Sequence, residues 1–198
     1  MINDFTTFVP KKRFIDEDHC KHIIQTGIAG GKYEGFSKVG LDAPLENHKV
    51  RKSEVYFFRN LELERHILGK VLEINQSLWK FDVTEIETLQ LSIYQDGGHY
   101  MWHADNDTTS KSEVTRKLSF SLLLNSGKDF NGGELELETW LMGNNGFDDV
   151  PFTSYKIKAP AVPGTLIVFP SYVRHRVLPV TKGVRYSLVG WITGKPWI

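Results

Sequence analysis

The sequence has little of what marks secreted, membrane-spanning or nucleic-acid-binding proteins. Cys20 is the only cysteine in 198 residues, so no internal disulfide can form, which favours a reducing compartment. The N-terminal segment MINDFTTFVPKKRF lacks the apolar core of a signal peptide, and no run approaches the ~20 apolar residues of a membrane span. Lysine plus arginine balances aspartate plus glutamate, 24 of each, so no global field attracts nucleic acid or an anionic membrane. We therefore predict a soluble, cytoplasmic protein that binds neither.

The chain also lacks repeats, low-complexity tracts and an obvious linker, so we expect a single domain covering residues 1–198. Asp16 is placed to cap a helix at residues 17–26 that Gly27 ends, and an apolar stripe predicts a second helix at residues 62–79. Residues 32–53, which are polar and aperiodic, and the Gly-containing residues 141–154 are predicted loops. Loops of such length are typical of lids over active sites, and plain surface connections are the alternative.

From residue 84 onward the pattern changes to short β-rich runs separated by turns that contain glycine or proline. Nothing helical intervenes to build parallel βαβ units, so the pattern favours an antiparallel sandwich or jelly roll with the helices packed outside one sheet. We predict a mainly β fold with flanking helices, in which residues 1–83 support a core formed by residues 84–198. The predicted strands are ETLQLSIYQ, GHYMWHAD, KLSFSLLLN, GELELE, TSYKIKA, GTLIVFP, HRVLPVT and VRYSLVGWIT.

The segment YQDGGHYMWHAD carries the first candidate for chemistry. Alternate strand residues point to one face, so His103 and Asp105 could reach one ion. Two imidazoles and one carboxylate leave three octahedral positions open, as in non-haem Fe(II) oxygenases. His175, which opens a β-run just after a turn, is the best third ligand. The alternatives are an ordinary hydrogen-bonded pair and a site that uses His99, which has the same strand parity as His103.

Arg185 is the candidate anion-binding residue. In VRYSLVGWIT it shares one face with Ser187, Val189 and Trp191, and apolar neighbours on both faces predict a buried strand. A buried guanidinium needs an anionic partner, and its planar fork grips a carboxylate through two hydrogen bonds. That partner is either a ligand or a structural aspartate or glutamate.

Taken in order, these motifs resemble the Fe(II)/2-oxoglutarate dioxygenases of the prolyl 4-hydroxylase-like superfamily, and above all its PKHD-type hydroxylases. The likeness covers roughly residues 89–192, about half of the chain. It implies a double-stranded β-helix, a cupin-like form of the jelly roll that the turn spacing already predicts. The residues that carry it are Tyr94, Gly97, Tyr100, His103 and Asp105, followed by LSFSLLLN, GGEL and PGTLIVFPSYVRHRVLPVTKGVRYSLVGWI.

The resemblance also implies roles for individual residues. Arg185 matches the residue that pairs with the C5 carboxylate of 2-oxoglutarate, Tyr94 matches a tyrosine that hydrogen-bonds the same end, and Ser187 matches a further contact in some relatives. Trp191 matches an aromatic residue near the metal pocket. The implied facial triad for iron consists of His103, Asp105 and His175.

Two positions depart from particular branches of this superfamily. Leu123 stands where the animal oxygen-sensing branch has a cosubstrate-binding tyrosine, so that contact is absent. Arg185 stands where collagen prolyl hydroxylases have a lysine, which argues against placing the chain in that branch.

The implied reaction is hydroxylation of a substrate C–H bond with decarboxylation of 2-oxoglutarate to succinate. The implied cofactors are Fe(II), 2-oxoglutarate and O₂, with ascorbate supporting turnover as in many relatives. A peptidyl prolyl-type residue is the first choice of substrate and a small molecule the alternative, because nothing in the sequence identifies a peptide groove. The balanced charge disfavours a nucleic-acid demethylase, and the intact triad and arginine disfavour a non-catalytic jelly-roll binding module.

Overall fold

The computed structural model describes residues 7–29, 32–33, 49–106, 113–141 and 153–197, in which strands predominate. The strands are β1 (Val9–Lys11), β2 (Lys32–Tyr33), β3 (Arg51–Lys52), β4 (Glu54–Phe58), β5 (Glu85–Ile86), β6 (Leu89–Gln95), β7 (His99–His103), β8 (Thr115–Leu123), β9 (Phe130–Gly132), β10 (Leu135–Leu141), β11 (Thr153–Lys158), β12 (Leu166–Pro170), β13 (His175–Val177) and β14 (Val180–Gly194).

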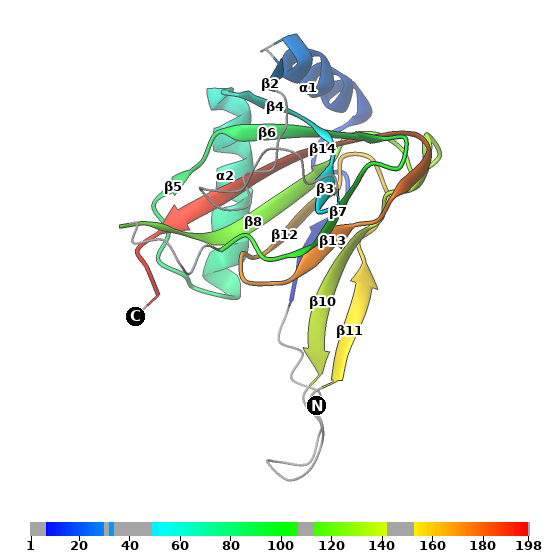
Figure 1. Ribbon diagram of the computed structural model, residues 1–198. Coiled ribbons are helices and arrows are strands. Elements are labelled where there is room, and N and C mark those ends of the chain that lie inside the picture. Colours follow the sequence, from blue (N-terminus) through cyan, green and yellow to red (C-terminus); the bar gives the residue numbers. More distant parts are fainter. Residues whose placement is uncertain (1–6, 30–31, 34–48, 107–112, 142–152, 198) are drawn as a thin grey trace.

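These strands form two antiparallel sheets that face each other (Figure 1). The larger sheet has the order β1-β12-β8-β14-β6-β4-β2, with β5 and β9 also paired to β14. The smaller sheet has the order β11-β10-β13-β7-β3. Two facing antiparallel sheets joined in this order form the jelly roll that the turn spacing predicts, in the double-stranded β-helix form that the resemblance implies.

All eight predicted β-runs form strands, but the run HRVLPVT is divided between β13 and the start of β14. The strands β1 to β5 and β9 were missed because runs of two to five residues are too short to show alternation. Several of them come from the first 83 residues: β1 pairs with β12, β3 with β7 and β4 with β6. The N-terminal segment therefore extends both sheets as well as supporting them.

The two predicted helices form as α1 (Glu17–Ala29) and α2 (Leu61–Ser77). Asp16 caps α1, since its Oδ1 accepts a hydrogen bond of 2.8 Å from the backbone N–H of His19. Gly27 was predicted to end this helix, and that prediction is wrong. A Cβ at Gly27 would lie 2.7 Å from Cδ2 of Leu91, so the glycine serves the close approach of α1 to the larger sheet.

Helix α2 lies along the outer face of the larger sheet (Figure 1). It begins after Asn60, whose side chain accepts a hydrogen bond from the N–H of Leu63, and it ends two residues before the predicted position. Its apolar stripe packs on outward-facing sheet residues to form one core. A second core fills part of the space between the two sheets. Neither described helix has the length and apolar character that crossing a membrane requires.

Both predicted loops lie largely outside the described residues, which omit 34–48 and 142–152. The ends of both loops were predicted wrongly, because residues 32–33 and 51–52 of the first and residues 141 and 153–154 of the second are in strands. Strand β2 pairs with β4 of the larger sheet, and β3 pairs with β7 of the smaller one. The second loop joins the paired strands β10 and β11.

Candidate active site

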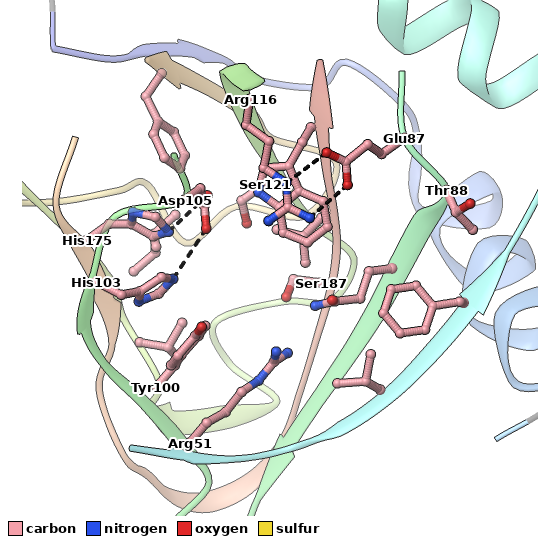
Figure 2. A pocket seen from close by; sticks show the side chains of 18 of the residues that line it. Arg51, Glu87, Thr88, Tyr100, His103, Asp105, Arg116, Ser121, His175 and Ser187 are labelled. Carbon is pink, nitrogen blue, oxygen red and sulfur yellow. Dashed lines mark hydrogen bonds and ion pairs between the residues drawn. The ribbon is translucent and has the colours of Figure 1, made fainter. Parts of the chain in front are cut away.

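A cavity of about 840 Å³ lies between the two sheets, and both sheets contribute side chains to its wall (Figure 2). The residues predicted to bind the metal ion and the cosubstrate all line it, namely Tyr94, His103, Asp105, His175, Arg185 and Ser187. Val189 and Trp191, which were predicted to share a face with Arg185, line it as well.

His103, Asp105 and His175 converge at one point of this wall. The two histidines are direct partners on the adjacent strands β7 and β13. Nε2 of His103 lies 3.5 Å from Oδ1 of Asp105, and Nε2 of His175 lies 3.4 Å from Oδ2 (Figure 2). Their potential ligand atoms all fall within 4.8 Å of one another, and no other such group of His, Cys, Asp or Glu occurs in the described part of the chain.

A β-bulge directs His103 into the cavity. The register between β13 and β7 shifts between the pairs His175↔His103 and Val177↔Tyr100, so β7 has one extra residue there. As a result Tyr100 and His103, three positions apart, both line the cavity, and their ring centres are 3.6 Å apart.

The bulge decides between the two rival histidines. His99 shares the parity of His103 in a regular strand, but it does not line the cavity, and its Nδ1 lies 2.9 Å from the carbonyl oxygen of Gly97. The same-face argument for the pair was also wrong in detail, because β7 ends at His103 and Asp105 lies beyond it.

The hydrogen bonds of both imidazoles leave the correct nitrogen free for a metal ion. Nδ1 of His103 lies 2.8 Å from the carbonyl oxygen of Met101, and Nδ1 of His175 lies 2.9 Å from that of Val173. A carbonyl oxygen only accepts, so each Nδ1 carries a proton, and in the neutral ring the lone pair of each Nε2 is available to a metal ion. Burial lowers the pKa of His175, against the opposing charge of Asp105, and so favours the neutral form of the ring, which is the form that binds a metal ion.

The donor set and its spacing fit a divalent transition-metal ion. Adjacent ligand atoms in an octahedral site lie roughly 3 Å apart, and the separation of 3.5 Å between Nε2 of His103 and Oδ1 of Asp105 needs only a small contraction. Burial raises the pKa of Asp105, but His175, His103 and a hydrogen bond from Ser119 together hold it well below its ordinary value. The carboxylate is therefore ionised and available as a ligand.

Two buried serines that the sequence analysis missed hold Asp105 in place. Ser119 of β8 donates a hydrogen bond of 2.7 Å to Oδ2. The carbonyl oxygen of Ser171 accepts hydrogen bonds from the backbone N–H groups of Asp105 and Asn106, at 2.8 and 3.1 Å respectively. For Ser119 the available signal was a small polar residue inside the apolar run LSFSLLL, and Ser171 lies outside that run.

Arg185 faces the same cavity with 3% of its surface exposed. It donates a hydrogen bond of 2.8 Å to Ser187, and no carboxylate in the described ranges pairs with it. The structural salt bridge that was the alternative is thus not observed there. Burial lowers the pKa of Arg185, which reflects the cost of a desolvated cation that an anionic ligand would relieve.

Further along the cavity, a second group of side chains lies beyond the metal-binding residues (Figure 2). Arg116 makes two hydrogen bonds of 2.8 and 2.7 Å to Glu87, and its guanidinium carbon lies 3.7 Å from a ring centre of Trp191. The buried Nε1 of Trp191 has no acceptor among the described residues. On the other side, the guanidinium of Arg51 lies 4.7 Å from the ring centre of Tyr100.

Known proteins share both the sequence pattern and the fold. The profile of the 2OG-Fe(II) oxygenase superfamily matches residues 89–193. A PKHD-type hydroxylase of Idiomarina loihiensis is 30% identical over 187 residues, which cover 90% of this chain and 73% of that protein. Another, from Hyphomonas neptunium, is 36% identical over 104 residues, or 52% of this chain, but the match spans only 41% of its length.

Among solved structures, a prolyl-4-hydroxylase of Pseudomonas putida superimposes with a TM-score of 0.68 at 20% identity. The superposition covers 96% of this chain and 94% of the bacterial enzyme. At this level of identity the likeness concerns the fold.

Proposed function

The chain belongs to the 2OG-Fe(II) oxygenase superfamily, and we propose that it is an Fe(II)- and 2-oxoglutarate-dependent dioxygenase that hydroxylates a C–H bond of its substrate. The observation that carries this proposal is a shared cavity wall. It holds a group of two histidines and one carboxylate together with a buried arginine that has no carboxylate partner in the described ranges. Such a group leaves three positions of an octahedral ion free, and the arginine offers a counter-charge for a dicarboxylate.

In this proposal Fe(II) is held by His103, Asp105 and His175. Bound iron and 2-oxoglutarate supply chemistry that side chains lack, namely activation of O₂ for insertion of one oxygen atom into a C–H bond, with succinate and CO₂ as co-products. The protein contributes fixed ligand atoms, because the carbonyl partners of both Nδ1 groups prevent the rings from turning. It also contributes a cavity wall that limits access of water.

Arg185 binds the far carboxylate of 2-oxoglutarate in the proposal, with Tyr94 and Ser187 beside it. Ser187 already accepts a hydrogen bond from one guanidinium nitrogen, which holds the fork in place before the ligand arrives. The remaining N–H donors of Arg185 are then available for a carboxylate in two-point contact.

For the substrate we propose a prolyl-type residue within a peptide or protein. The cavity is larger than one dicarboxylate needs, and its wall carries a hydrogen-bond donor that suits a peptide carbonyl group. The guanidinium of Arg51, which lines the cavity, is such a donor. The fold likeness to a bacterial prolyl-4-hydroxylase supports the same choice.

Two further features belong to the same proposal. Ascorbate is a supporting reductant, which the likeness to PKHD-type hydroxylases suggests. The reaction takes place in the cytoplasm, which the lone, buried cysteine favours, because Cys20 forms no disulfide within the chain.

Turnover with and without substrate candidates tests the proposal. Purified protein loaded with Fe(II) is incubated with 2-oxoglutarate in air, and succinate is measured by NMR. We expect slow uncoupled succinate formation, which proline-containing peptides accelerate with a mass gain of one oxygen atom on the peptide. Asp105→Ala and Arg185→Ala serve as negative controls. Acceleration by small molecules alone would favour the small-molecule alternative, and absence of succinate under every condition would favour a binding module.

A further inference from the structure

Ser119 stands in an unusual place for a hydroxyl group. It lies on β8, which is flanked by β12 and β14 in the larger sheet (Figure 1). Its direct neighbours across the sheet are Phe169 and Trp191, and it has no exposed surface. A hydroxyl in such surroundings is costly unless it is hydrogen-bonded, so its partners indicate its purpose.

Those partners form a chain that ends on the candidate metal ligand. Ser119 Oγ lies 2.7 Å from Oδ2 of Asp105 and 2.9 Å from Oγ of Ser171. An ionised carboxylate only accepts hydrogen bonds, so Ser119 gives its one proton to Asp105. The hydroxyl of Ser171 must then donate to Ser119, and each bond in such a chain strengthens the next.

The backbone of Asp105 is held from the same side. The carbonyl oxygen of Ser171 accepts the N–H of Asp105, while the N–H of Ser171 is bonded to the carbonyl oxygen of Lys117 on β8. The side chain of Asp105 is thus hydrogen-bonded to Ser119 on β8, and its main chain is hydrogen-bonded to Ser171, the residue that follows β12. With the backbone fixed, Oδ2 is held by the hydrogen bond from Ser119 and lies 3.4 Å from Nε2 of His175, while Oδ1 accepts no hydrogen bond from a serine of the described ranges and lies 3.5 Å from Nε2 of His103.

We propose that Ser119 is a positioning residue that fixes the Asp105 carboxylate so that Oδ1 alone binds the metal ion. This inference rests on the proposed function. A carboxylate bound through one oxygen leaves three positions free beside the two histidines, enough for a chelating 2-oxo acid and O₂. A carboxylate bound through both oxygens would leave two, which the 2-oxo acid alone fills.

The test uses Co(II) as a probe, because its visible spectrum reports the number and arrangement of ligands. Titrations of wild-type protein, Ser119→Ala, Ser119→Thr and Ser121→Ala are followed in the absence and presence of 2-oxoglutarate. Ser121 lies two residues further along β8, is 6% exposed, lines the same cavity and has no hydrogen bond to Asp105 in the described ranges. It therefore controls for loss of a buried serine hydroxyl.

We expect Ser119→Ala to weaken Co(II) binding by about 10- to 100-fold, the usual effect of removing a partner of a metal ligand. Its spectrum should change most with 2-oxoglutarate bound. Ser119→Thr, which keeps the hydroxyl, should restore the wild-type spectrum, and Ser121→Ala should retain both spectrum and affinity. A changed spectrum at unchanged affinity also supports the proposal. In that case the second carboxylate oxygen of Asp105 also binds the ion, and this compensates in affinity for the lost hydrogen bond.

An affinity within twofold of wild type together with a superimposable spectrum would overturn the role of Ser119. If Ser119→Ala does not fold, Ser171→Ala takes its place, since it removes the donor to Ser119 and should change the spectrum in part. A wild-type spectrum in Ser171→Ala then counts against the proposal. Failure of wild-type protein itself to bind Co(II) would instead refute the metal centre and the proposed function.

Discussion

Arg185 and Tyr94 are direct partners on the antiparallel strands β14 and β6, and the guanidinium carbon lies 5.5 Å from the centre of the tyrosine ring. Both residues are 3% exposed. The pair therefore forms a desolvated wall with one positive charge, at the end of the cavity proposed to receive the far carboxylate of 2-oxoglutarate.

Replacing Arg185 by alanine should weaken 2-oxoglutarate binding with little effect on the metal ion. Loss of one partner of a buried charge pair costs about 2–5 kcal/mol, which corresponds to a roughly 30- to several-thousand-fold higher dissociation constant. Calorimetric titration of the Mn(II)-loaded protein with 2-oxoglutarate measures this change. Arg185→Lys should recover only part of it, because an ammonium lacks the planar fork.

Arg174→Ala is the matched control, because Arg174 is an arginine paired with Glu138 at a half-exposed position that does not line the cavity. It should bind 2-oxoglutarate as the wild-type protein does. Equal affinity in Arg185→Ala and wild type would show that Arg185 does not bind the cosubstrate.

The two histidines of β7 offer an internal test of the metal site. His103→Ala should reduce affinity for Fe(II) or Co(II) by more than about 100-fold, since loss of a ligand exceeds the effect of losing a supporting hydrogen bond. His99→Ala should leave the affinity unchanged, because His99 does not line the cavity. Anaerobic titration measures both variants. The opposite result, with metal lost only in His99→Ala, would mean that the bulge does not determine which histidine binds.

The sequence was sufficient for the architecture wherever a pattern extended over many residues. A capping residue indicated the first helix, an apolar stripe indicated the second, and turn residues separated the eight predicted β-runs. The prediction of element boundaries failed where contact between two segments far apart in the sequence determines the local structure. Gly27 has the local character of a helix stop, yet contact with Leu91 of β6 explains its presence inside α1.

The site shows the same division. Residue types and spacing made His103, Asp105, His175 and Arg185 candidates, the family resemblance selected them over the alternatives, and the structure places them on one cavity. The means of their convergence could not be deduced, because the bulge in β7 depends on pairing with β13. Ser119 has no motif of its own either, and only the folded sheet brings it to Asp105.

Cys20 should be unreactive in the folded protein. It is 1% exposed, and burial raises the pKa of its thiol to about 11 from an ordinary 9.0. At pH 8 only about one thiol in a thousand is then ionised, so a disulfide reagent such as DTNB should react fully only after addition of denaturant. Rapid reaction of the native protein would contradict the burial of Cys20.

The same shift predicts a pH dependence of stability. Because the thiol of the unfolded chain loses its proton at lower pH than that of the folded protein, the unfolded state gains stability first as pH rises. The free energy of unfolding should therefore decline between about pH 9 and pH 11 through this group. Urea titrations at several pH values measure the decline, and Cys20→Ala should show a shallower one.

A pair of glycine substitutions tests the packing of the two helices. Gly69 lies in α2, and a Cβ added there would have nothing within 4 Å among the described residues. Gly69→Ala should therefore stabilise the protein by about 0.5–1 kcal/mol through helix propensity alone.

Gly27→Ala gains the same helix propensity, but its Cβ would lie 2.7 Å from Leu91 Cδ2 and 3.2 Å from Phe58 Cε1. Leu91 is fully buried, so its side chain has no free space to enter. Overpacking of this kind costs about 1–3 kcal/mol, and we expect a net loss of stability in thermal or urea unfolding. Stabilisation by both substitutions would show that α1 does not pack closely on β6.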